Sequence, residues 1–210
     1  MNTFDQDMAL AREIAVRVGD AGGRAMLVGG VVRDGLLGVP CKDIDLEVYG
    51  LAPAALQALL SQFGAVQQRG ASFGVFGLAH SGLDIAIPRR ERRTGAKHTD
   101  FDVSVDPNLS FEAASMRRDF TINAMLRDPL TGELVDLWRG QADLAAGVIR
   151  HVNDRTFPED ALRVFRAAQF AARLEAQIAP ETLALCAGMD VTALSVERVF
   201  DELSKALMKA

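Results

Sequence analysis

Apolar residues in the first half of the chain recur at helical spacing in some stretches and at strand spacing in others. Helical spacing covers residues 5–18 and 53–63, and a short helix is expected after the glycine pair at 29–30. Apolar runs at 24–28, 44–48 and 83–88 predict strands, and in the last two every second residue is apolar. With two further short strands expected within 66–79, this order predicts an α+β fold, with helices flanking a mixed sheet.

The second half is dominated by helical patterns. A helix is expected at 110–123 and a hairpin at 124–137, and from residue 142 onward the spacing is almost entirely helical. Thr156 and Glu159 have the spacing of a capping box for a helix that continues to residue 172. A last helix, starting at a Ser195 cap, is expected to bury an apolar stripe. We therefore expect two domains, residues 1–140 and residues 141–210.

Carboxylates gather on the polar side of the predicted strands. Asp43 and Asp45 are two residues apart, so on a strand they project to the same face, and Asp84 occupies a polar position on another alternating strand. Adjacent carboxylates repel each other unless a positive charge lies between them. Brought together, the three could hold two Mg²⁺ ions about 4 Å apart, whereas a single aspartate of this kind is more often solvated or caps a turn.

A glycine turn precedes this acidic strand. Gly29 and Gly30 end a strand and open a helix, which offers backbone N–H groups to a phosphate, and Arg33 follows on that helix. The pair could equally be only a turn. Neither a Walker loop nor a GxGxxG turn is present.

Two further groups combine arginine with aspartate. Arg117, Arg118 and Asp119 could bind phosphate and ribose, or form a solvated helix face. Asp160 and Arg163 could face the edge of a nucleobase, or form a salt bridge three residues apart on a helix.

Composition narrows the class of protein. The net charge of −5 argues against coating nucleic acid through bulk charge, although residues 89–98 predict a mobile basic loop. Two distant cysteines suit a reducing cytoplasm, and no apolar run is long enough for a membrane span. The three histidines are scattered, so they indicate neither a metal site nor a catalytic base.

Several motifs, in this order, resemble the class II tRNA nucleotidyltransferase and bacterial poly(A) polymerase family, which includes the CCA-adding enzymes. They run from residue 27 to residue 203 and read LVGGVVRDGLLG, DIDLE, LDIAIPRRERRTG, RRDFTINAM, DLWRGQADL, EDALRVFRAAQFAARL and SVERVFDEL. Each motif is weak alone, but their order and spacing together are specific.

The resemblance implies a polymerase-β-like nucleotidyltransferase head followed by a small all-α neck, and it assigns roles to individual residues. Asp43 and Asp45 resemble the catalytic metal-binding pair, with Asp84 as a third carboxylate where many relatives have glutamate. The residues that it implies for nucleotide binding are Gly29, Gly30, Arg33, Arg117, Arg118, Asp119, Asn123, Asp160, Arg163 and Arg166. Among these, Asp160 and Arg163 resemble the pair that selects ATP and CTP, and the loop at 89–98 resembles an element that helps to switch from C to A addition.

The implied activity is Mg²⁺-dependent, template-independent addition of C and A to the 3′ end of tRNA, from CTP and ATP. Poly(A) or A-only addition, and a non-catalytic RNA-binding or regulatory subunit, are the alternatives. Family members normally continue into helical body and tail domains that hold tRNA. A missing C-terminal region or a separate chain is therefore expected to supply tRNA binding, and the 210 residues alone are expected to bind tRNA weakly.

Overall fold

The computed structural model describes residues 3–41, 43–68, 74–93 and 101–208. The chain divides into two compact units. The first comprises residues 1–90, 103–114 and 125–135, and the second comprises residues 91–102, 115–124 and 136–210. The units therefore do not follow one boundary in the sequence, because the segment at 115–124 groups with the C-terminal residues. The functional domains 1–140 and 141–210 stay a prediction.

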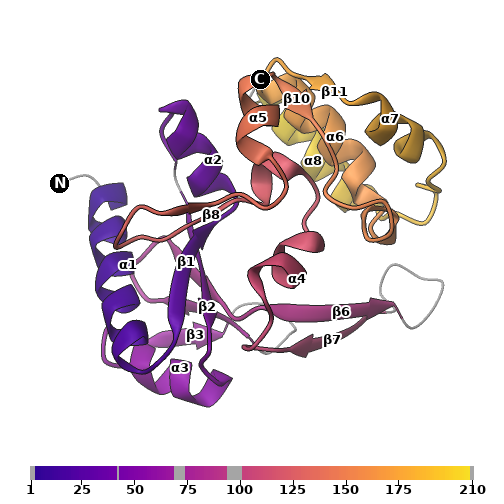
Figure 1. The fold of residues 1–210 in the computed structure, drawn as a ribbon. Coiled ribbons are helices and arrows are strands. Elements are labelled where there is room, and N and C mark those ends of the chain that lie inside the picture. Colours follow the sequence, from indigo (N-terminus) through magenta and orange to yellow (C-terminus); the bar gives the residue numbers. More distant parts are fainter. Residues whose placement is uncertain (1–2, 42, 69–73, 94–100, 209–210) are drawn as a thin grey trace. The chain divides into compact units, whose positions relative to one another are not determined.

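The first unit is built on a seven-stranded mixed sheet (Figure 1). Its strands lie in the order β3-β4-β5-β2-β1-β8-β9, with β2 and β5 parallel and all other pairs antiparallel. Their bounds are β1 (Arg24–Val28), β2 (Ile44–Tyr49), β3 (Val66–Gln68), β4 (Val75–Leu78), β5 (Leu83–Ala86), β8 (Leu126–Arg127) and β9 (Leu134–Val135). The predicted strands at 24–28, 44–48 and 83–88 are confirmed, as is the hairpin, although its strands have only two residues each.

The two faces of this sheet are occupied differently. Ile44, Leu46 and Val48 are almost fully buried, as the alternation predicted. The opposite face carries a second apolar cluster further along β1 and β2, around Met26, Val28, Tyr49, Leu109, Ala114 and Leu126. The sheet is thus buried on both faces in its centre, and Asp45 and Asp84 lie toward one end of β2 and β5.

Among the described residues, three helices belong wholly to the first unit. They are α1 (Thr3–Asp20), α2 (Gly30–Leu37) and α3 (Pro53–Leu60). Helix α1 packs against β1, β2 and α3 and buries Ala11, Ile14 and Val18 at helical spacing (Figure 1). Pro53 occupies the first turn of α3, where a backbone N–H has no partner within the helix and the lack of one in proline costs nothing.

The basic segment after β5 is not only a loop. Residues Arg89–Arg93 form strand β6, which pairs with β7 (Phe101–Val105) in a separate two-stranded sheet. The expectation of a loop from residue 89 is therefore wrong over its first five residues. Arg90 is held by Asp106, to which its Nε donates over 2.9 Å. The rest of the predicted basic loop, residues 94–98, lies outside the described residues.

The second unit is mainly helical. Its elements are η1 (Thr121–Asn123), α5 (Gly140–Ala145), β10 (Val148–Ile149), η2 (Phe157–Glu159), α6 (Leu162–Arg173), β11 (Gln177–Ile178), α7 (Pro180–Ala187) and α8 (Val196–Met208). Strands β10 and β11 pair in parallel, so the expected all-α neck contains one small sheet. The core gathers around Phe120 and Phe157, both fully buried, with Phe170 beside them.

The predicted helix at 110–123 is interrupted. Helix α4 spans only Phe111–Met116, and the backbone then extends so that Phe120 bridges His151. The reason is local, because the Asp119 side chain accepts the N–H of Phe120 over 2.7 Å in place of a helical carbonyl. Arg117 and Arg118 therefore lie outside any helix.

The predicted capping box also fails to form. Thr156 makes no side-chain cap, because its hydroxyl donates to the carbonyl of Met116 over 2.8 Å. A short 3₁₀ turn replaces the first helical turn, and α6 begins only at Leu162. The N–H of Leu162 is instead accepted by Asp160 over 3.1 Å.

Helix α8 begins after Ser195 as predicted, but it does not bury its apolar stripe. Val196 is 79% exposed, Phe200 67% and Leu207 83%. The buried position on this helix is acidic, since Glu202 is only 4% exposed. Among the described ranges, no helix combines the length and the apolar character needed to cross a bilayer.

Candidate functional site

Strands β2 and β5 place two of the predicted carboxylates side by side. Asp45 and Asp84 are register partners in the parallel pair, and both are partly buried. Asp43 lies just before β2, two residues from Asp45, and is exposed. Its backbone carbonyl accepts the thiol of Cys41. The pairing register of β2 with β5 therefore places the carboxylates of Asp45 and Asp84 next to each other, with Asp43 nearby in the sequence.

These carboxylates do not form a metal cage by themselves. No group of three histidine, cysteine or acidic side chains that could hold an ion occurs in the described part of the chain. Magnesium is usually held by one or two carboxylates together with waters and substrate phosphates. Asp43 and Asp45 beside Asp84 have the donor chemistry for such an open site.

The glycine turn has the backbone that its sequence requires. Gly29 has φ +69° and ψ −128°, a region that side chains avoid, and it caps α2 without a side-chain hydrogen bond. Its carbonyl accepts the N–H of Arg33 over 3.2 Å. The Arg33 guanidinium is buried and is held by Asp34 over 2.7 Å, while a Cβ added at Gly30 would lie 3.7 Å from that guanidinium. Arg33 therefore lies against the turn.

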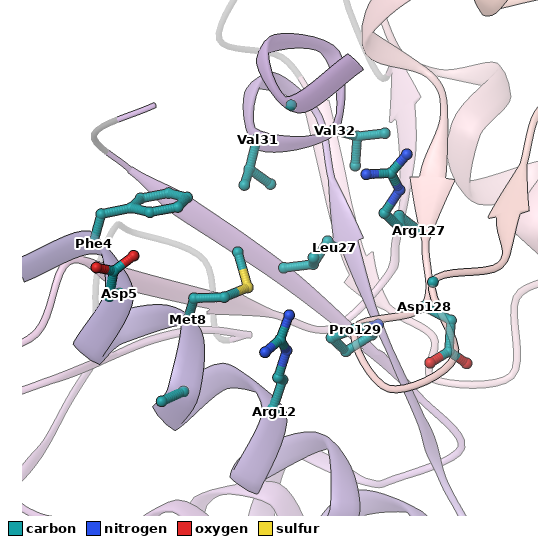
Figure 2. Close-up of a pocket in the computed structure, with 13 residues that line it drawn as sticks. Phe4, Asp5, Met8, Arg12, Leu27, Val31, Val32, Arg127, Asp128 and Pro129 are labelled. Carbon is teal, nitrogen blue, oxygen red and sulfur yellow. The ribbon is translucent and has the colours of Figure 1, made fainter. Parts of the chain in front are cut away.

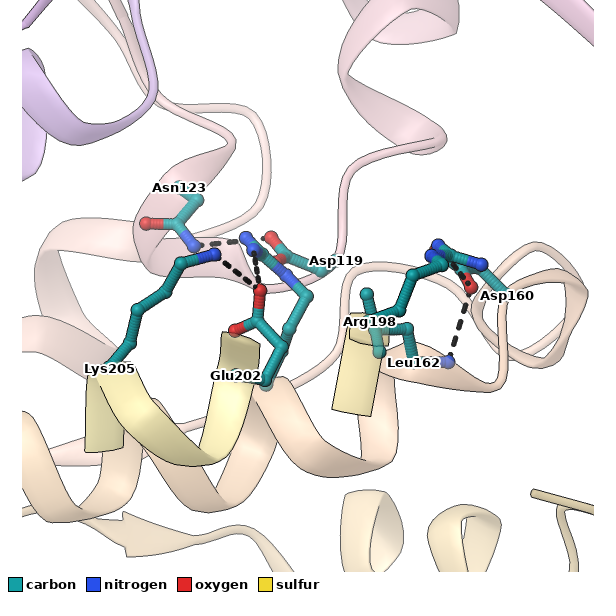
Figure 3. Close-up of polar contacts among 8 residues, drawn as sticks. Asp119, Asn123, Asp160, Leu162, Arg198, Glu202 and Lys205 are labelled. Carbon is teal, nitrogen blue, oxygen red and sulfur yellow. Dashed lines mark hydrogen bonds and ion pairs between the residues drawn. The ribbon is translucent and has the colours of Figure 1, made fainter. Parts of the chain in front are cut away.

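In the second unit, Asp119 is the centre of a buried network (Figure 3). One carboxylate oxygen accepts the N–H of Phe120 and the side-chain amide of Asn123, the latter over 3.1 Å. The other accepts two guanidinium nitrogens of Arg166, over 2.7 and 2.6 Å. Arg166 in turn lies 3.8 Å from Glu202, which also accepts Lys205. Both oxygens of Asp119 are thus occupied within its own unit.

The charge of Asp119 is stabilised by these contacts. Burial raises the pKa of Asp119, but the attraction of Arg166 and the hydrogen bonds from Asn123, Arg166 and Phe120 outweigh it, so the pKa lies below its ordinary value. Burial lowers the pKa of Arg166, but the attraction of Asp119 and its hydrogen bond raise it by more, so the pKa of Arg166 lies above its ordinary value. The ion pair is therefore charged at neutral pH.

This lowered pKa predicts a pH dependence of stability. An aspartate titrates near pH 3.9 in the unfolded chain, and the folded-state pKa of Asp119 is lower. Its contribution to stability is therefore present above about pH 4 and lost as the pH falls through the folded-state value. We expect the stability gap between wild type and Asp119→Asn, measured by urea unfolding, to narrow between pH 6 and pH 3. A gap that stays constant, or the same narrowing for Asp201→Asn on the exposed side of α8, would contradict this.

Asp160 and Arg163, expected as one pair, have different partners in the structure. Asp160 lies 3.4 Å from the guanidinium of Arg198 on α8 and accepts the N–H of Leu162, the first residue of α6 (Figure 3). The guanidinium of Arg163 donates to the carbonyls of Thr156 and Arg117 and lies over the ring of Phe157. The side chain of Arg163 is therefore positioned by backbone carbonyls, and no salt bridge joins it to Asp160 among the residues that the structure describes.

Sequence reasoning missed two residues of this region. Arg198 is the partner of Asp160, and Glu202 is a buried acid beside Arg166. They lie four residues apart on α8, so they share a helix face. The spacing of Arg198 and Glu202 within SVERVFDEL could have indicated that both lie on the packed face of α8. The apolar residues of the same helix instead predicted that the opposite face is buried.

The curated proteins include clear relatives of this chain. The multifunctional CCA protein of Xylella fastidiosa (strain M23) is 42% identical over 191 residues, which cover 88% of this chain and 44% of that protein. The multifunctional CCA protein of Neisseria gonorrhoeae (strain NCCP11945) is 44% identical over 187 residues, covering 87% and 44%. The chain thus spans less than half the length of these relatives.

Solved structures have the same fold. The CCA-adding enzyme of Bacillus stearothermophilus in complex with CTP matches with a TM-score of 0.80 and 30% identity, over 99% of this chain and 49% of that one. The Thermotoga maritima CCA-adding enzyme complexed with tRNA matches with a TM-score of 0.78 and 27% identity, over 96% and 47%. They confirm the α+β class and the mixed-sheet head. A model of the poly A polymerase head domain matches residues 25–150, more than half of the chain, and the protein therefore belongs to the poly A polymerase head domain family.

Proposed function

We propose that this protein is a template-independent RNA nucleotidyltransferase that adds C and A to the 3′ end of tRNA from CTP and ATP. Membership of the family and the names of its relatives support this activity. The structural observation that carries it is the register of Asp45 with Asp84, which sets two carboxylates side by side with Asp43 two residues away. No requirement of the sheet explains two like charges directly opposite each other, since such pairs are destabilising.

These carboxylates are the groups that we propose for the chemical step. Asp43 and Asp45 would hold Mg²⁺, which supplies charge neutralisation at the phosphates and a lowered pKa for the attacking hydroxyl. In the reaction the 3′-hydroxyl of the RNA attacks the α-phosphorus and pyrophosphate leaves. Asp84 adds a third negative charge at the same end of the sheet, and its fixed register keeps Asp45 in position.

The glycine turn is proposed to bind the triphosphate. Gly29 and Gly30 carry no side chain at the start of α2, and the N-terminus of a helix favours negative charge. Arg33 contacts this turn, because its guanidinium lies next to Gly30 and is held in place by Asp34. In the second unit, Arg117, Arg118 and Asn123 are the proposed contacts of ribose and phosphates.

Asp160 and Arg163 are proposed to read the base. Cytosine and adenine both carry an exocyclic amino group, whereas uracil and guanine carry a carbonyl at the matching position. A carboxylate accepts from an amino group and repels a carbonyl, so Asp160 would select C and A together. Arg163, held by two backbone carbonyls, keeps further donors for the ring nitrogen beside that amino group. The carboxylate of Asp160 now pairs with Arg198. An incoming amino group would either bind the same carboxylate beside Arg198 or take the place of Arg198.

The test is incorporation with tRNA that ends before its CCA. With Mg²⁺ and high tRNA, we expect labelled CTP alone to extend the RNA by two nucleotides, and CTP with ATP to extend it by three, with neither UTP nor GTP incorporated. Gel analysis of the labelled RNA measures each product.

The other outcomes separate the alternatives. Incorporation of A alone would indicate a poly(A) or A-adding enzyme. No incorporation at any tRNA concentration would indicate a non-catalytic RNA-binding subunit that retains the fold. We place the activity in the cytoplasm, which fits the two free cysteines, Cys41 and Cys186.

A further inference from the structure

A cavity of about 570 Å³ lies within the first unit and has no part in the proposed reaction (Figure 2). Helix α1, strand β1, helix α2 and the β8–β9 hairpin surround it. This volume is typical of a site for a small organic ligand. The residues that the argument uses are Phe4, Met8, Arg12, Leu27, Val31 and Arg127.

The cavity lies on the opposite face of the sheet from the carboxylates. Leu27 is the register partner of both Leu46 and Arg127, so these three side chains share a face. Asp45 neighbours Leu46 along β2 and therefore projects to the other face. A ligand in the cavity would not occupy the candidate metal site.

One side of the cavity is apolar. Phe4 and Met8 come from α1, Leu27 from the middle of the sheet, and Val31 from the first turn of α2 (Figure 2). A surface of this kind accepts the flat or aliphatic body of a ligand, because the ligand's apolar area is removed from water.

Two arginines without partners line the same cavity. Neither Arg12 nor Arg127 makes a side-chain hydrogen bond or ion pair with any described residue, and the Nε of Arg127 is buried with no partner. A buried donor that lacks an acceptor is unfavourable and calls for an explanation such as a bound water or ion. Gly35 lies beside this guanidinium, and a Cβ added there would make only an ordinary contact with it, at 4.0 Å.

The acidic residues at the rim do not neutralise these arginines. Asp128 accepts the N–H groups of Leu130 and Thr131 and the guanidinium of Arg24. Figure 2 shows its carboxylate directed away from Arg12. Asp5 has another interaction partner. Neither acid therefore holds the guanidinium of Arg12 or Arg127 by a hydrogen bond or ion pair among the described residues.

We propose that this cavity binds a small organic anion whose phosphate or carboxylate group pairs with the guanidinium of Arg127 and whose apolar body packs on Phe4, Met8 and Leu27, with Arg12 supplying a second positive charge on the other side of Leu27 (Figure 2). Arginine presents a planar fork that matches both groups. The bound molecule would also touch Val31, two residues before Arg33. The site does not depend on the proposed nucleotidyl transfer, because it uses none of the same residues.

The probes are 2-naphthyl phosphate and 2-naphthoate, with 2-naphthol and inorganic phosphate as the two halves of the ligand. Titration followed by ¹H–¹⁵N NMR should shift the amide signals of Arg12, Leu27, Val31 and Arg127 for one or both complete anions. The isolated halves should bind at least tenfold more weakly. The tighter of the two anions identifies the head group.

Variants make the assignment. Arg127→Gln should weaken binding of the tighter anion at least about tenfold, the loss expected for one charge-assisted contact, and Arg12→Gln should weaken it less, while the NMR spectrum shows that the fold is kept. Arg155→Gln is the matched control, since Arg155 is an exposed arginine without side-chain partners in the described chain. An Arg127→Gln protein that binds the tighter anion as strongly as wild type does, shifts confined to the exposed apolar stripe of α8, or binding of 2-naphthol as tight as that of the anions would overturn the proposal. Incorporation assays report separately on the proposed function, since none of these probes carries a nucleobase.

Discussion

Replacing Asp45 with asparagine is expected to lower nucleotide incorporation by about 10³-fold or more while the protein remains folded. The side chain keeps its size but loses the charge that a divalent ion requires. Charge stabilisation by such an ion contributes several kcal/mol to the transition state, and each 1.4 kcal/mol changes the rate tenfold. Single-turnover incorporation of labelled CTP at saturating tRNA measures the loss.

Two comparisons make this result specific to the site. Thermal unfolding of Asp45→Asn should stay within a few degrees of wild type, because Asp84 lies directly opposite and like charges across a sheet repel. Asp20→Asn, at the exposed end of α1, is the matched control and should retain the wild-type rate. If Asp45→Asn kept more than a tenth of that rate, the role of these carboxylates in the reaction would have to be abandoned.

Replacing Asp119 with alanine should lower the free energy of unfolding by about 3–5 kcal/mol, the range for removing one partner of a buried ion pair. The change leaves the Arg166 guanidinium, the Asn123 amide and the N–H of Phe120 without their acceptor. For a protein of this size the melting temperature should fall by roughly 10 °C. Urea unfolding without any nucleotide measures the effect.

The partner substitution tests whether the loss comes from the pair. In Asp119→Leu combined with Arg166→Met, no buried charge remains uncompensated at this pair, so much of the stability should return. Asp201→Ala is the control on the same unit, and its unfolding free energy should change by less than about 0.5 kcal/mol. An Asp119→Ala protein as stable as wild type would show that the network is not structural, and would leave ligand recognition as the role of Asp119.

The sheet and its acidic end were predictable from the sequence because strand alternation fixes which side chains share a face. Asp45 and Asp84 both interrupt an apolar alternation, and the structure makes them register partners. The ends of β8 and β9 were less predictable, since a strand of two residues has no periodicity.

The predicted helix at 110–123 and the predicted capping box were wrong because side chains there make hydrogen bonds that the helical pattern does not anticipate. Asp119 takes the N–H of Phe120 and ends the helical path, and Thr156 bonds to Met116 instead of capping its helix. The pairing of Asp160 with Arg198 joins residues 38 positions apart. The spacing of residues within one helix cannot reveal a contact between residues so far apart in the sequence. The i, i+3 spacing therefore indicated Arg163 as the partner of Asp160 in place of Arg198.

The interlaced path of the chain also bears on how this protein can have evolved. The chain passes between the two compact units five times, at residues 90–91, 102–103, 114–115, 124–125 and 135–136. A single recombination event between related genes would therefore join part of one parent's unit to part of the other's. Only exchanges with several crossover points would transfer a unit intact, so we expect both units to have been inherited together and to share one line of descent.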